Sequence, residues 1–302
     1  MQSWDLNRKI MVTQTRIIEW YQHYKGNVYV AFSGGKDSTV LLHIVRQIYP
    51  DVPAVFVNTG LEFPEVQAFA RSQENVTVLK PEMNFRKVIE TYGYPVVSKR
   101  VADTVEYGAK PGSYRWKELH GEIMRSNGTP SEFNCEKWCY LLNAPFKVSS
   151  RCCNIMKKKP MKKYSKETGR VPIIATMAEE SRSRRSTWMK QGCNAFSKKD
   201  PTSQPMSFWT ENDVLEYLYT YSVPYAPVYG EIVRDGGGWR TTGERRTGCV
   251  FCAFGAHLEK SPNRFQRLKL SHPKLWDYCM RPWSEHGLGM REVLEYIGIQ
   301  CE

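Results

Sequence analysis

The sequence contains no long apolar run and no recognisable leader. None of its hydrophobic stretches approaches the roughly 20 residues that a membrane-spanning helix needs. The segment Met1–Lys25 mixes polar and apolar side chains and lacks the apolar core of a signal peptide. These two absences argue against a membrane partner and predict a cytoplasmic location.

Acidic residues are the minority among the charged side chains. There are 31 Asp and Glu against 43 Lys and Arg, which gives a formal net charge of +12. This balance favours an anionic partner, and nucleic acid, a nucleotide or an acidic protein would each satisfy it. The nine cysteines do not suggest a disulfide framework, because such frameworks are rare in the cytosol. Metal ligation or redox chemistry is therefore the first hypothesis for them.

One stretch has the pattern of a buried strand, a tight glycine turn and a helix. The strand is the apolar run 28–32, and a second apolar run, 39–45, is long enough to form a helix. Adjacent glycines let backbone N–H groups approach a ligand, and the following helix directs its positive end to the same place. Phosphate or sulfate is the expected ligand, although the spacing is not that of the Walker loop. The turn consists of Ser33, Gly34, Gly35, Lys36, Asp37 and Ser38.

The same alternation recurs along the chain. Further buried strands are predicted at 53–57, 76–79 and 171–175, and helices at 39–48 and 85–92. Alternating strands and helices predict an α/β fold, here a Rossmann-like parallel sheet with helices on both faces. A small C-terminal helical part that contains cysteines is expected to follow it.

Four cysteines form a pattern that suits one soft metal centre. Cys152 and Cys153 are adjacent. Much later in the chain, Cys249 and Cys252 form a CxxC pair. CxxC spacing places two sulfurs on one turn, and adjacent cysteines can splay around a metal. An iron–sulfur cluster, a zinc ion, and unliganded buried or redox-active thiols all fit this pattern.

Several segments resemble one family. The turn SGGKDS resembles the pyrophosphate-binding loop (PP-loop) of the adenine nucleotide alpha-hydrolase superfamily, which includes ATP pyrophosphatases and phosphoadenosine phosphosulfate (PAPS) reductases. Asn58–Glu65 resembles the DTGxxFPET element of the reductases, with Asn58 in place of the usual aspartate. The segment 151–160 resembles the adjacent-cysteine element of iron–sulfur-containing adenylylsulfate (APS) and PAPS reductases. The segments 176–185 and 205–217 resemble their arginine element and their PLxxWTxxDVxxY element.

This resemblance implies the ligands and the residues that hold them. It implies an adenine nucleotide (PAPS, APS or ATP) as substrate and a [4Fe–4S] cluster as cofactor, with zinc as the less favoured metal. In the reductases an arginine of this element contacts phosphate or sulfate, and we assign that contact to Arg184. The implied nucleotide-binding residues are Ser33, Gly34, Gly35, Lys36, Asp37, Ser38, Thr59, Gly60, Glu62, Ser181 and Arg184. The implied cluster ligands are Cys152, Cys153, Cys249 and Cys252.

Domain boundaries are predicted from the same segments. Residues 1–25 form an N-terminal helix that precedes the first strand. Residues 26–235 form the PP-loop nucleotide-binding α/β domain, with a polar insertion at 102–140. Residues 236–302 form the C-terminal cluster-binding part.

The leading hypothesis for function is an oxidoreductase of sulfur metabolism that resembles PAPS/APS reductases and binds its nucleotide next to the cluster. A cysteine thiolate would attack the sulfate sulfur, and a thiol reductant such as thioredoxin would release the product. In the reductases the nucleophile lies in a C-terminal ECGLH tail, which the segment Tyr296–Glu302 lacks. Cys301 occupies a comparable place and is the candidate nucleophile.

Two other functions fit the sequence. An ATP pyrophosphatase that adenylylates a nucleic acid or a metabolite for sulfur insertion would explain the net charge and the missing tail motif. A non-catalytic nucleotide-binding regulatory module would need the loop and a structural cluster only. The candidate partners therefore include nucleic acid. A homo-oligomer, with a second copy of the chain as partner, is also possible.

Overall fold

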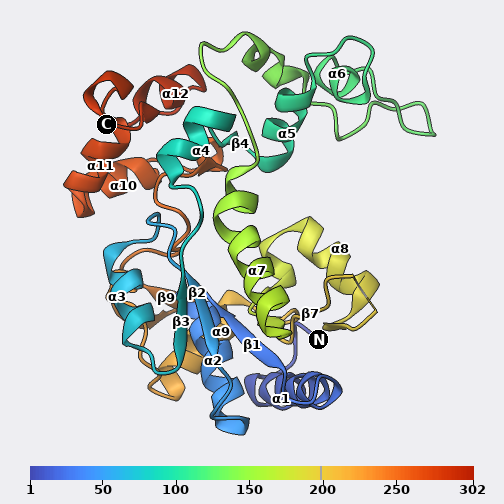
Figure 1. Ribbon diagram of the computed structural model, residues 1–302, viewed down its shortest axis with the longest axis vertical. Helices are drawn as coiled ribbons and strands as arrows, with labels where there is room; N and C mark the ends of the chain where they lie inside the picture. Colours follow the sequence, from blue (N-terminus) through green and yellow to red (C-terminus); the bar gives the residue numbers. More distant parts are fainter. Residues whose placement is uncertain (198) are drawn as a thin grey trace. The chain divides into compact units, whose positions relative to one another are not determined.

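The computed structural model describes residues 1–197 and 199–302, which form two compact units (Figure 1). Unit 1 consists of Met1–Asn58, Glu62–Pro81 and Lys159–Thr247. Unit 2 consists of Thr59–Leu61, Glu82–Lys158 and Gly248–Glu302. Each unit is therefore assembled from three separate pieces of the chain, and we describe each by itself.

Unit 1 is built on a six-stranded sheet with the order β3-β2-β1-β5-β7-β6. Its strands are β1 (Val28–Phe32), β2 (Ala54–Val57), β3 (Val76–Leu79), β5 (Val171–Ile174), β6 (Asn194–Ala195) and β7 (Thr202–Ser203). All neighbours pair in parallel except β6 and β7. In the register of the central strand, Val30 pairs with Ala54 on one side and with Ile173 on the other. A parallel strand in this position is covered on both faces, which explains why β1 is an unbroken run of apolar residues.

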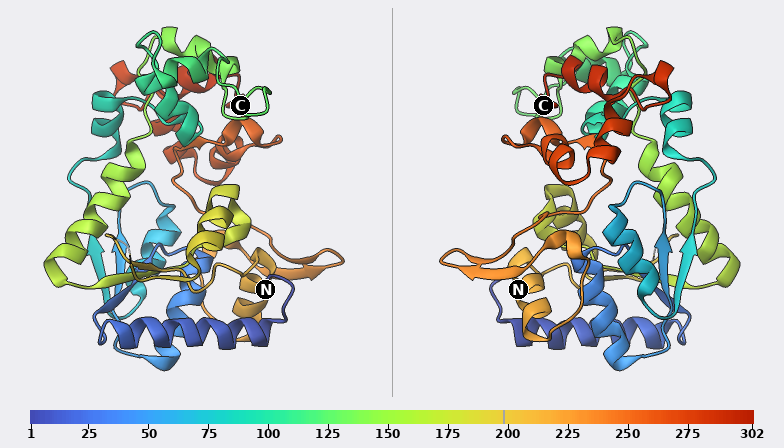
Figure 2. Two further views of the ribbon diagram at one scale, coloured as in Figure 1. Left: turned by 90° about the vertical axis from the view of Figure 1, so that its right-hand side faces the viewer. Right: turned by 90° about the vertical axis from the view of Figure 1, so that its left-hand side faces the viewer.

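Helices cover both faces of this sheet. Figures 1 and 2 show α7 on one face and α2 and α9 on the other. The long N-terminal helix α1 is joined to α9 by a buried ion pair, in which Lys9 Nζ lies 2.6 Å from Asp213 Oδ2. The helices of unit 1 are α1 (Leu6–His23), α2 (Lys36–Ile48), α3 (Pro64–Ser72), α7 (Lys159–Thr168), α8 (Arg182–Gln191) and α9 (Glu211–Thr220), with the 3-10 turns η3 (Ala178–Glu180) and η4 (Pro227–Tyr229).

A β-hairpin follows α9 in unit 1. Its strands are β8 (Ile232–Asp235) and β9 (Gly238–Thr241), which pair in antiparallel fashion. The three consecutive glycines 236–238, which the sequence leaves without an assigned structure, lie at the hairpin turn and the start of β9.

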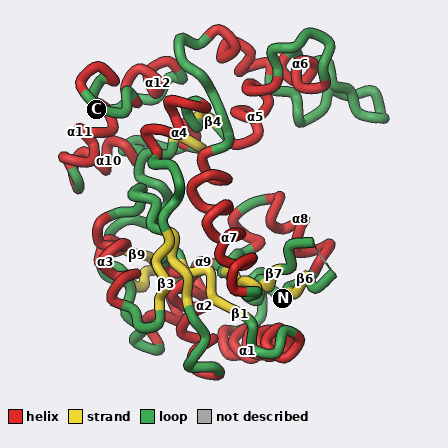
Figure 3. Tube along the Cα trace, viewed as in Figure 1, coloured by secondary structure: helices red, strands yellow, loops and turns green. Residues whose placement is uncertain are grey.

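Unit 2 is mainly helical, as the tube in Figure 3 shows. Its one two-stranded sheet pairs β4 (Val96–Val97) in parallel with β10 (Ala253–Phe254). The α-helices are α4 (Phe85–Tyr92), α5 (Lys99–Tyr107), α6 (Tyr114–Leu119), α10 (Arg264–Ser271), α11 (Pro273–Met280) and α12 (Met290–Tyr296). The other helical segments are the 3-10 segments η1 (Glu136–Asn143), η5 (Ala256–Leu258) and η6 (Trp283–Glu285) and the π-helical segment η2 (Asn154–Lys158).

The predicted fold class is confirmed. The strands predicted at 28–32 and 76–79 and the helix at 85–92 match β1, β3 and α4 residue for residue. The two-residue strands β4, β6, β7 and β10 were not predicted, because segments this short carry no periodic signal. Within the residues that the structure describes, no helix is both long and apolar enough to span a membrane.

Candidate phosphate loop and cysteine cluster

The SGGKDS segment directly follows β1, and its last three residues, Lys36–Ser38, form the start of α2, whose N-cap is Gly35. The hydroxyl groups hold the turn together. Ser38 Oγ accepts a hydrogen bond from Ser33 N at 3.2 Å and donates to Gly35 O at 2.9 Å. Such a turn at a helix N-terminus is shaped to bind an anion. The serines therefore order the loop as well as offering donors.

Both the backbone conformation and the steric surroundings at position 34 require glycine. Its φ is +72°, which L side chains rarely adopt. A Cβ there would lie 2.8 Å from Val66 Cγ1 and 3.0 Å from Val66 O. The loop is thus packed directly on α3, and this close contact fixes its path.

Lys36 is buried and already has partners inside unit 1. Its Nζ donates to Arg245 O at 2.8 Å and lies 3.2 Å from Glu211 Oε1. Its backbone N–H donates to the hydroxyl of Tyr229 at 3.1 Å, and this hydroxyl lies 2.6 Å from Thr247 Oγ1. Sequence reasoning missed these contacts, because Tyr229, Glu211 and Thr247 lie far along the chain and follow no motif spacing.

Asp37 combines burial with an unsatisfied oxygen. Among residues 1–197 and 199–302, no hydrogen-bond partner reaches its buried Oδ1. Burial raises the pKa of Asp37, whereas Lys36 opposes the shift, and Arg246 and Arg184 are near enough to oppose it too. A buried acceptor without a partner is uncommon and is usually completed by water or a ligand.

Two arginines near the loop are held by one carboxylate, that of Glu180. Arg184 forms an ion pair with Glu180, four residues earlier. Arg246 Nη1 lies 3.7 Å from the other oxygen of Glu180. Burial lowers the pKa of Arg184, and the positive charge of Arg246 lowers it further. Such arginines suit a ligand with several negative charges, because a phosphate can replace a carboxylate partner.

The other predicted nucleotide-binding residues have local structural roles. Ser181 caps α8, because its hydroxyl accepts a hydrogen bond from Arg184 N at 3.2 Å. In unit 2, Thr59 Oγ1 accepts from Leu61 N at 3.2 Å, and Gly60 has a φ of +74°. Glu62 is buried in unit 1, where its carbonyl accepts from Gln67 Nε2 at 3.1 Å.

The four predicted metal ligands all belong to unit 2. The short sheet explains how the two cysteine pairs meet. Strand β10 directly follows Cys252, and its partner β4 is followed by Ser98 and then by Lys99 at the start of α5. The hydrogen bond from Cys152 lowers the pKa of Cys153, and Lys99 lowers it further. The pKa of Cys152 is raised by its hydrogen bond to Cys153 and by burial, and further by the nearby Cys252 and Cys249. The four sulfurs therefore share one electrostatic environment.

Cys152 and Cys153 shift each other's pKa through a direct hydrogen bond between their sulfurs. The Cys152 thiol donates to Cys153 Sγ at 4.0 Å. This hydrogen bond, assisted by Lys99 and Lys157, lowers the pKa of Cys153, while the same bond and burial raise the pKa of Cys152. Burial also raises the pKa of Cys252 to about 11. A positive metal centre would reverse these upward shifts, because a coordinating thiol is deprotonated.

The sulfurs are not arranged as a finished metal site. In the part of the chain that the structure describes, no group of three or more His, Cys, Asp or Glu residues has ligating geometry. The donor chemistry nevertheless fits a soft metal, because four thiols in one basic environment are what an iron–sulfur cluster or zinc requires. All nine cysteines are present as thiols.

Cys301, the candidate nucleophile, is buried in unit 2. Its thiol donates to Ile299 O at 3.7 Å. Burial, with a contribution from Glu295, raises the pKa of Cys301 to about 11. A thiol in this environment is protonated at neutral pH and would have to become exposed before it could act as a thiolate.

The fold and the loop together define an α/β protein of the PP-loop class. The sequence model of the phosphoadenosine phosphosulfate reductase domain matches residues 27–104 and 129–244. The chain belongs to this family. The unmatched residues 105–128 fall inside the predicted insertion.

Individual relatives are distant. The chain is 25% identical over 280 residues to MJ0066, an uncharacterised protein of Methanocaldococcus jannaschii, with 89% of this chain and 45% of that protein covered. It is 27% identical over 220 residues to an adenosine 5'-phosphosulfate reductase of Bacillus cereus, with 70% of this chain and 72% of the reductase covered. The chain spans about half the length of the first two curated relatives it matches, 45% and 53%.

Among solved structures, the chain resembles the U34-tRNA thiolase NcsA from Methanococcus maripaludis, which contains a [4Fe–4S] cluster. The identity is 15% and the TM-score 0.40, with 98% of this chain and 83% of NcsA covered. A likeness at this level says nothing about function.

Proposed function

We propose that this protein is a sulfur-metabolism enzyme that binds an adenine nucleotide at the SGGKDS loop and acts as an APS or PAPS reductase. The observation that carries the proposal is the loop itself, which has a glycine turn at a helix N-terminus surrounded by cations. Arg184 and Arg246 would exchange their shared partner Glu180 for the phosphates of the nucleotide. The family membership and the similarity to a Bacillus reductase support the same class of substrate.

In the reductase reaction, a cysteine thiolate attacks the sulfate sulfur of the nucleotide. The bond between that sulfur and the bridging oxygen breaks, and the electron pair leaves with the nucleotide phosphate. The enzyme then carries an S-sulfocysteine. A second thiol, from a reductant such as thioredoxin, attacks the Sγ of this cysteine, so that a disulfide forms and sulfite leaves. Cys301 is our candidate nucleophile, and its burial means that it must become exposed to react.

We also propose that Cys152, Cys153, Cys249 and Cys252 hold a [4Fe–4S] cluster. When bound, such a cluster supplies a soft redox centre whose potential depends on the charges and hydrogen bonds around its sulfurs. Lys99 and Lys157 would offset the negative charge of the four thiolates. Arg264, which donates to Cys252 O at 2.9 Å, would fix the backbone beside one of them.

An ATP pyrophosphatase is the second candidate function. The observation that favours it is the protonated, buried state of Cys301, because a reaction at the α-phosphate of ATP needs no enzyme thiolate. The loop would then hold the β- and γ-phosphates, which leave as pyrophosphate, while the acceptor takes the adenylyl group. A regulatory module would bind nucleotide and release neither product.

One experiment separates the three functions. Protein reconstituted with iron and sulfide under anaerobic conditions is incubated with APS, PAPS or ATP, and sulfite and pyrophosphate are measured. Sulfite from APS or PAPS supports the reductase, and pyrophosphate from ATP without sulfite replaces it with the pyrophosphatase. Sulfite production that persists in Cys301→Ser removes Cys301 from the reaction. Iron and sulfide analysis with a visible spectrum decides between the cluster and zinc.

A further inference from the structure

Three hydroxyl groups from separate parts of unit 1 converge on Gly35, in the middle of the phosphate loop. A Cβ at position 35 would lie 3.2 Å from Ser33 Oγ, 3.3 Å from the hydroxyl oxygen of Tyr229 and 3.4 Å from Thr247 Oγ1, all tighter than an ordinary van der Waals contact. The φ of Gly35 is −80°, which any residue adopts. Glycine is therefore needed here for space and not for conformation.

Tyr229 is a fixed member of this group. It lies in η4, and only 2% of it is exposed. The chain that returns from the hairpin is bonded to η4, because Gly243 N donates to Tyr229 O at 2.8 Å and Glu244 N donates to Val228 O at 2.9 Å. Burial and these backbone hydrogen bonds hold the ring in place. A ligand of the loop would therefore bind beside Tyr229 and would not replace it.

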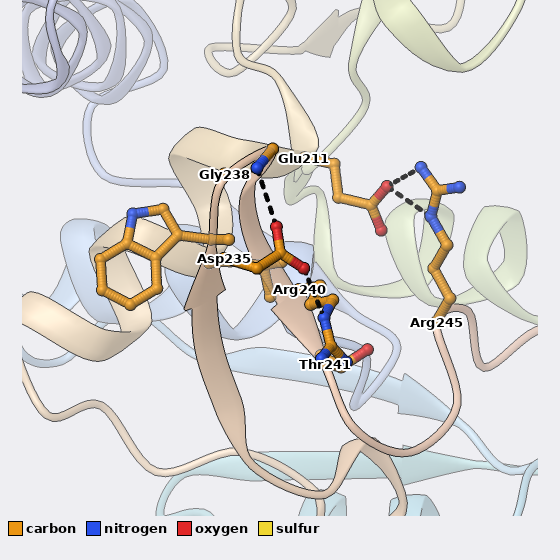
Figure 4. A pocket seen from close by; sticks show the side chains of 9 residues that line it. Glu211, Asp235, Gly238, Arg240, Thr241 and Arg245 are labelled. Carbon is orange, nitrogen blue, oxygen red and sulfur yellow. Dashed lines mark hydrogen bonds and ion pairs between the residues drawn. The ribbon is translucent and has the colours of Figure 1, made fainter.

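The segment 245–247, which carries Thr247, is anchored to the loop through Arg245. The carbonyl of Arg245 accepts a hydrogen bond from Lys36 Nζ at 2.8 Å, and Arg245 Nε donates to Glu211 Oε2 at 2.8 Å. In Figure 4 the guanidinium of Arg245 is directed at Glu211. These contacts hold Thr247 beside the loop.

The hydrogen bonds of Tyr229 determine which proton is left for a ligand. Its hydroxyl oxygen accepts from the backbone N–H of Lys36 at 3.1 Å and lies 2.6 Å from Thr247 Oγ1. Burial raises the pKa of Tyr229 to about 12, so the phenol keeps its proton at neutral pH. Among residues 1–197 and 199–302, Thr247 Oγ1 is the one acceptor within reach of this proton. Tyr229 therefore donates to Thr247, and the proton of the Thr247 hydroxyl stays available to a ligand.

The surroundings of Thr247 suit an oxyanion. The half-buried Thr247 hydroxyl lies next to the first turn of α2, whose N-terminal end favours negative charge. On the same turn, the buried Oδ1 of Asp37 has no partner within the described part of the chain. Two polar groups of the loop are thus left for a ligand or water to complete.

We propose that Thr247 binds a phosphate or sulfate oxygen of the nucleotide through its hydroxyl, and that Tyr229 positions Thr247 for this contact. The inference rests on the proposed function, because it needs a nucleotide in the loop. It extends the binding site to two residues that lie far along the chain from the SGGKDS segment.

The test is isothermal titration calorimetry of the full chain with ATP, APS and PAPS. Thr247→Val keeps the shape of the side chain without its hydroxyl and should weaken nucleotide binding about tenfold, as expected for a lost hydrogen bond to a charged group. Thr247→Ser keeps the hydroxyl and should bind nearly as tightly as the unchanged protein. Tyr229→Phe should weaken binding about threefold, because Thr247 is still present but is no longer oriented.

Two comparisons separate positioning from a general loss of structure. If Tyr229 acts through Thr247, the variant with both Tyr229→Phe and Thr247→Val should bind no more weakly than Thr247→Val alone. Tyr29→Phe is the matched control, because the buried hydroxyl of Tyr29 also pairs with a hydroxyl of unit 1, Ser165 Oγ at 3.0 Å, but lies on β1 before the loop. Tyr29→Phe should leave nucleotide binding unchanged. Urea titration of each variant measures its stability separately from binding.

Failure of this inference can be told from failure of the proposed function. If the unchanged protein binds none of the three nucleotides, the loop is not a nucleotide site and both are overturned. If a nucleotide binds but Thr247→Val or Tyr229→Phe binds it as tightly as the unchanged protein, the inference alone is overturned.

Two other results would also overturn it. Tighter binding by Tyr229→Phe would make Tyr229 a competitor for the N–H of Lys36, and an equal loss in Tyr29→Phe would show a general effect of removing a buried hydroxyl. If Tyr229→Phe is unfolded, Thr247→Val and Thr247→Ser still decide, because Thr247 is only half-buried.

Discussion

Gly34 provides the sharpest test of how the phosphate loop is built. Substitution of Gly34 by alanine should lower the free energy of unfolding for two distinct reasons. The first is conformational, because φ is +72° and a non-glycine residue in the left-handed region costs about 1–2 kcal/mol. The second is steric, because the new Cβ would lie 2.8 Å from Val66 Cγ1 and 3.0 Å from Val66 O. Overpacking of this kind typically costs about 1–3 kcal/mol.

Gly169 is the matched control for Gly34. It lies in the same unit with a φ of +69°, and a Cβ there would meet nothing within 4 Å. Gly169→Ala should therefore lose only the conformational part, about 1–2 kcal/mol, while Gly34→Ala loses about 2–5 kcal/mol. The difference between the two variants isolates the packing of the loop on α3.

Denaturant unfolding and nucleotide binding are the two assays. Gly34→Ala should unfold at lower denaturant than Gly169→Ala and should lose nucleotide binding, which Gly169→Ala should keep. Adding Val66→Ala to Gly34→Ala should recover part of the loss, with a coupling of about 1 kcal/mol in the double-mutant cycle. Equal losses for the two glycines, or no coupling to Val66, would refute the reasoning.

Three further predictions concern other parts of the molecule. Asp37→Asn should stabilise the protein at neutral pH. Burial raises the pKa of Asp37 in the folded state above its value in the unfolded chain. The folded protein therefore loses stability as the pH rises from the ordinary carboxyl pKa through this raised pKa, and asparagine avoids that loss. Thermal melts at several pH values should show the gain shrinking toward acid pH, and a constant gain would contradict the assignment to Asp37. Lys9→Met should lower the free energy of unfolding by about 3–5 kcal/mol, because the buried Asp213 carboxylate loses its counter-ion and keeps only its hydrogen bonds from Thr210. Lys87→Met, which breaks an exposed pair with Glu90, should leave the midpoint of the same urea titration nearly unchanged. Cys153→Ser should abolish iron binding in reconstituted protein while Cys193→Ser, in the other unit, retains it; equal iron content in both would exclude Cys153 as a ligand.

The sequence was sufficient to predict the first strand, the loop and the following helix. The reason is local, because an apolar run for β1, two glycines and an apolar helix face all lie within a few residues of one another. Tyr229, Glu211 and Thr247 could not be found in this way. Glu211 reaches the loop from the start of α9, which packs on α2, and Tyr229 reaches it from η4, which packs on α3. Thr247 reaches it because the chain returns after the hairpin, and no spacing along the sequence encodes these approaches.

The cysteines show a different limit of sequence reasoning. The adjacent pair and the CxxC pair can be recognised as candidate ligands by spacing, and the structure places all four in one unit. Their protonation cannot be deduced from spacing, because it depends on Lys99 and on burial. Cys301 has a suggestive position near the end of this sequence, yet its environment keeps it protonated. Position along the chain says nothing about whether a thiol is exposed.

Neither unit of this protein can be isolated by a simple truncation, because each consists of three separate pieces of the chain. The backbone passes from one unit to the other five times, so no single cut releases either unit whole. The two cysteine pairs lie on either side of the longest excursion, Lys159–Thr247. A cofactor held by both pairs would close a loop of roughly a hundred residues, and by analogy with a disulfide of that span would restrict the unfolded chain by about 4–5 kcal/mol. The cofactor would then stabilise the fold by linking two distant parts of the chain, and its loss would lower the free energy of unfolding even if it contacts no substrate.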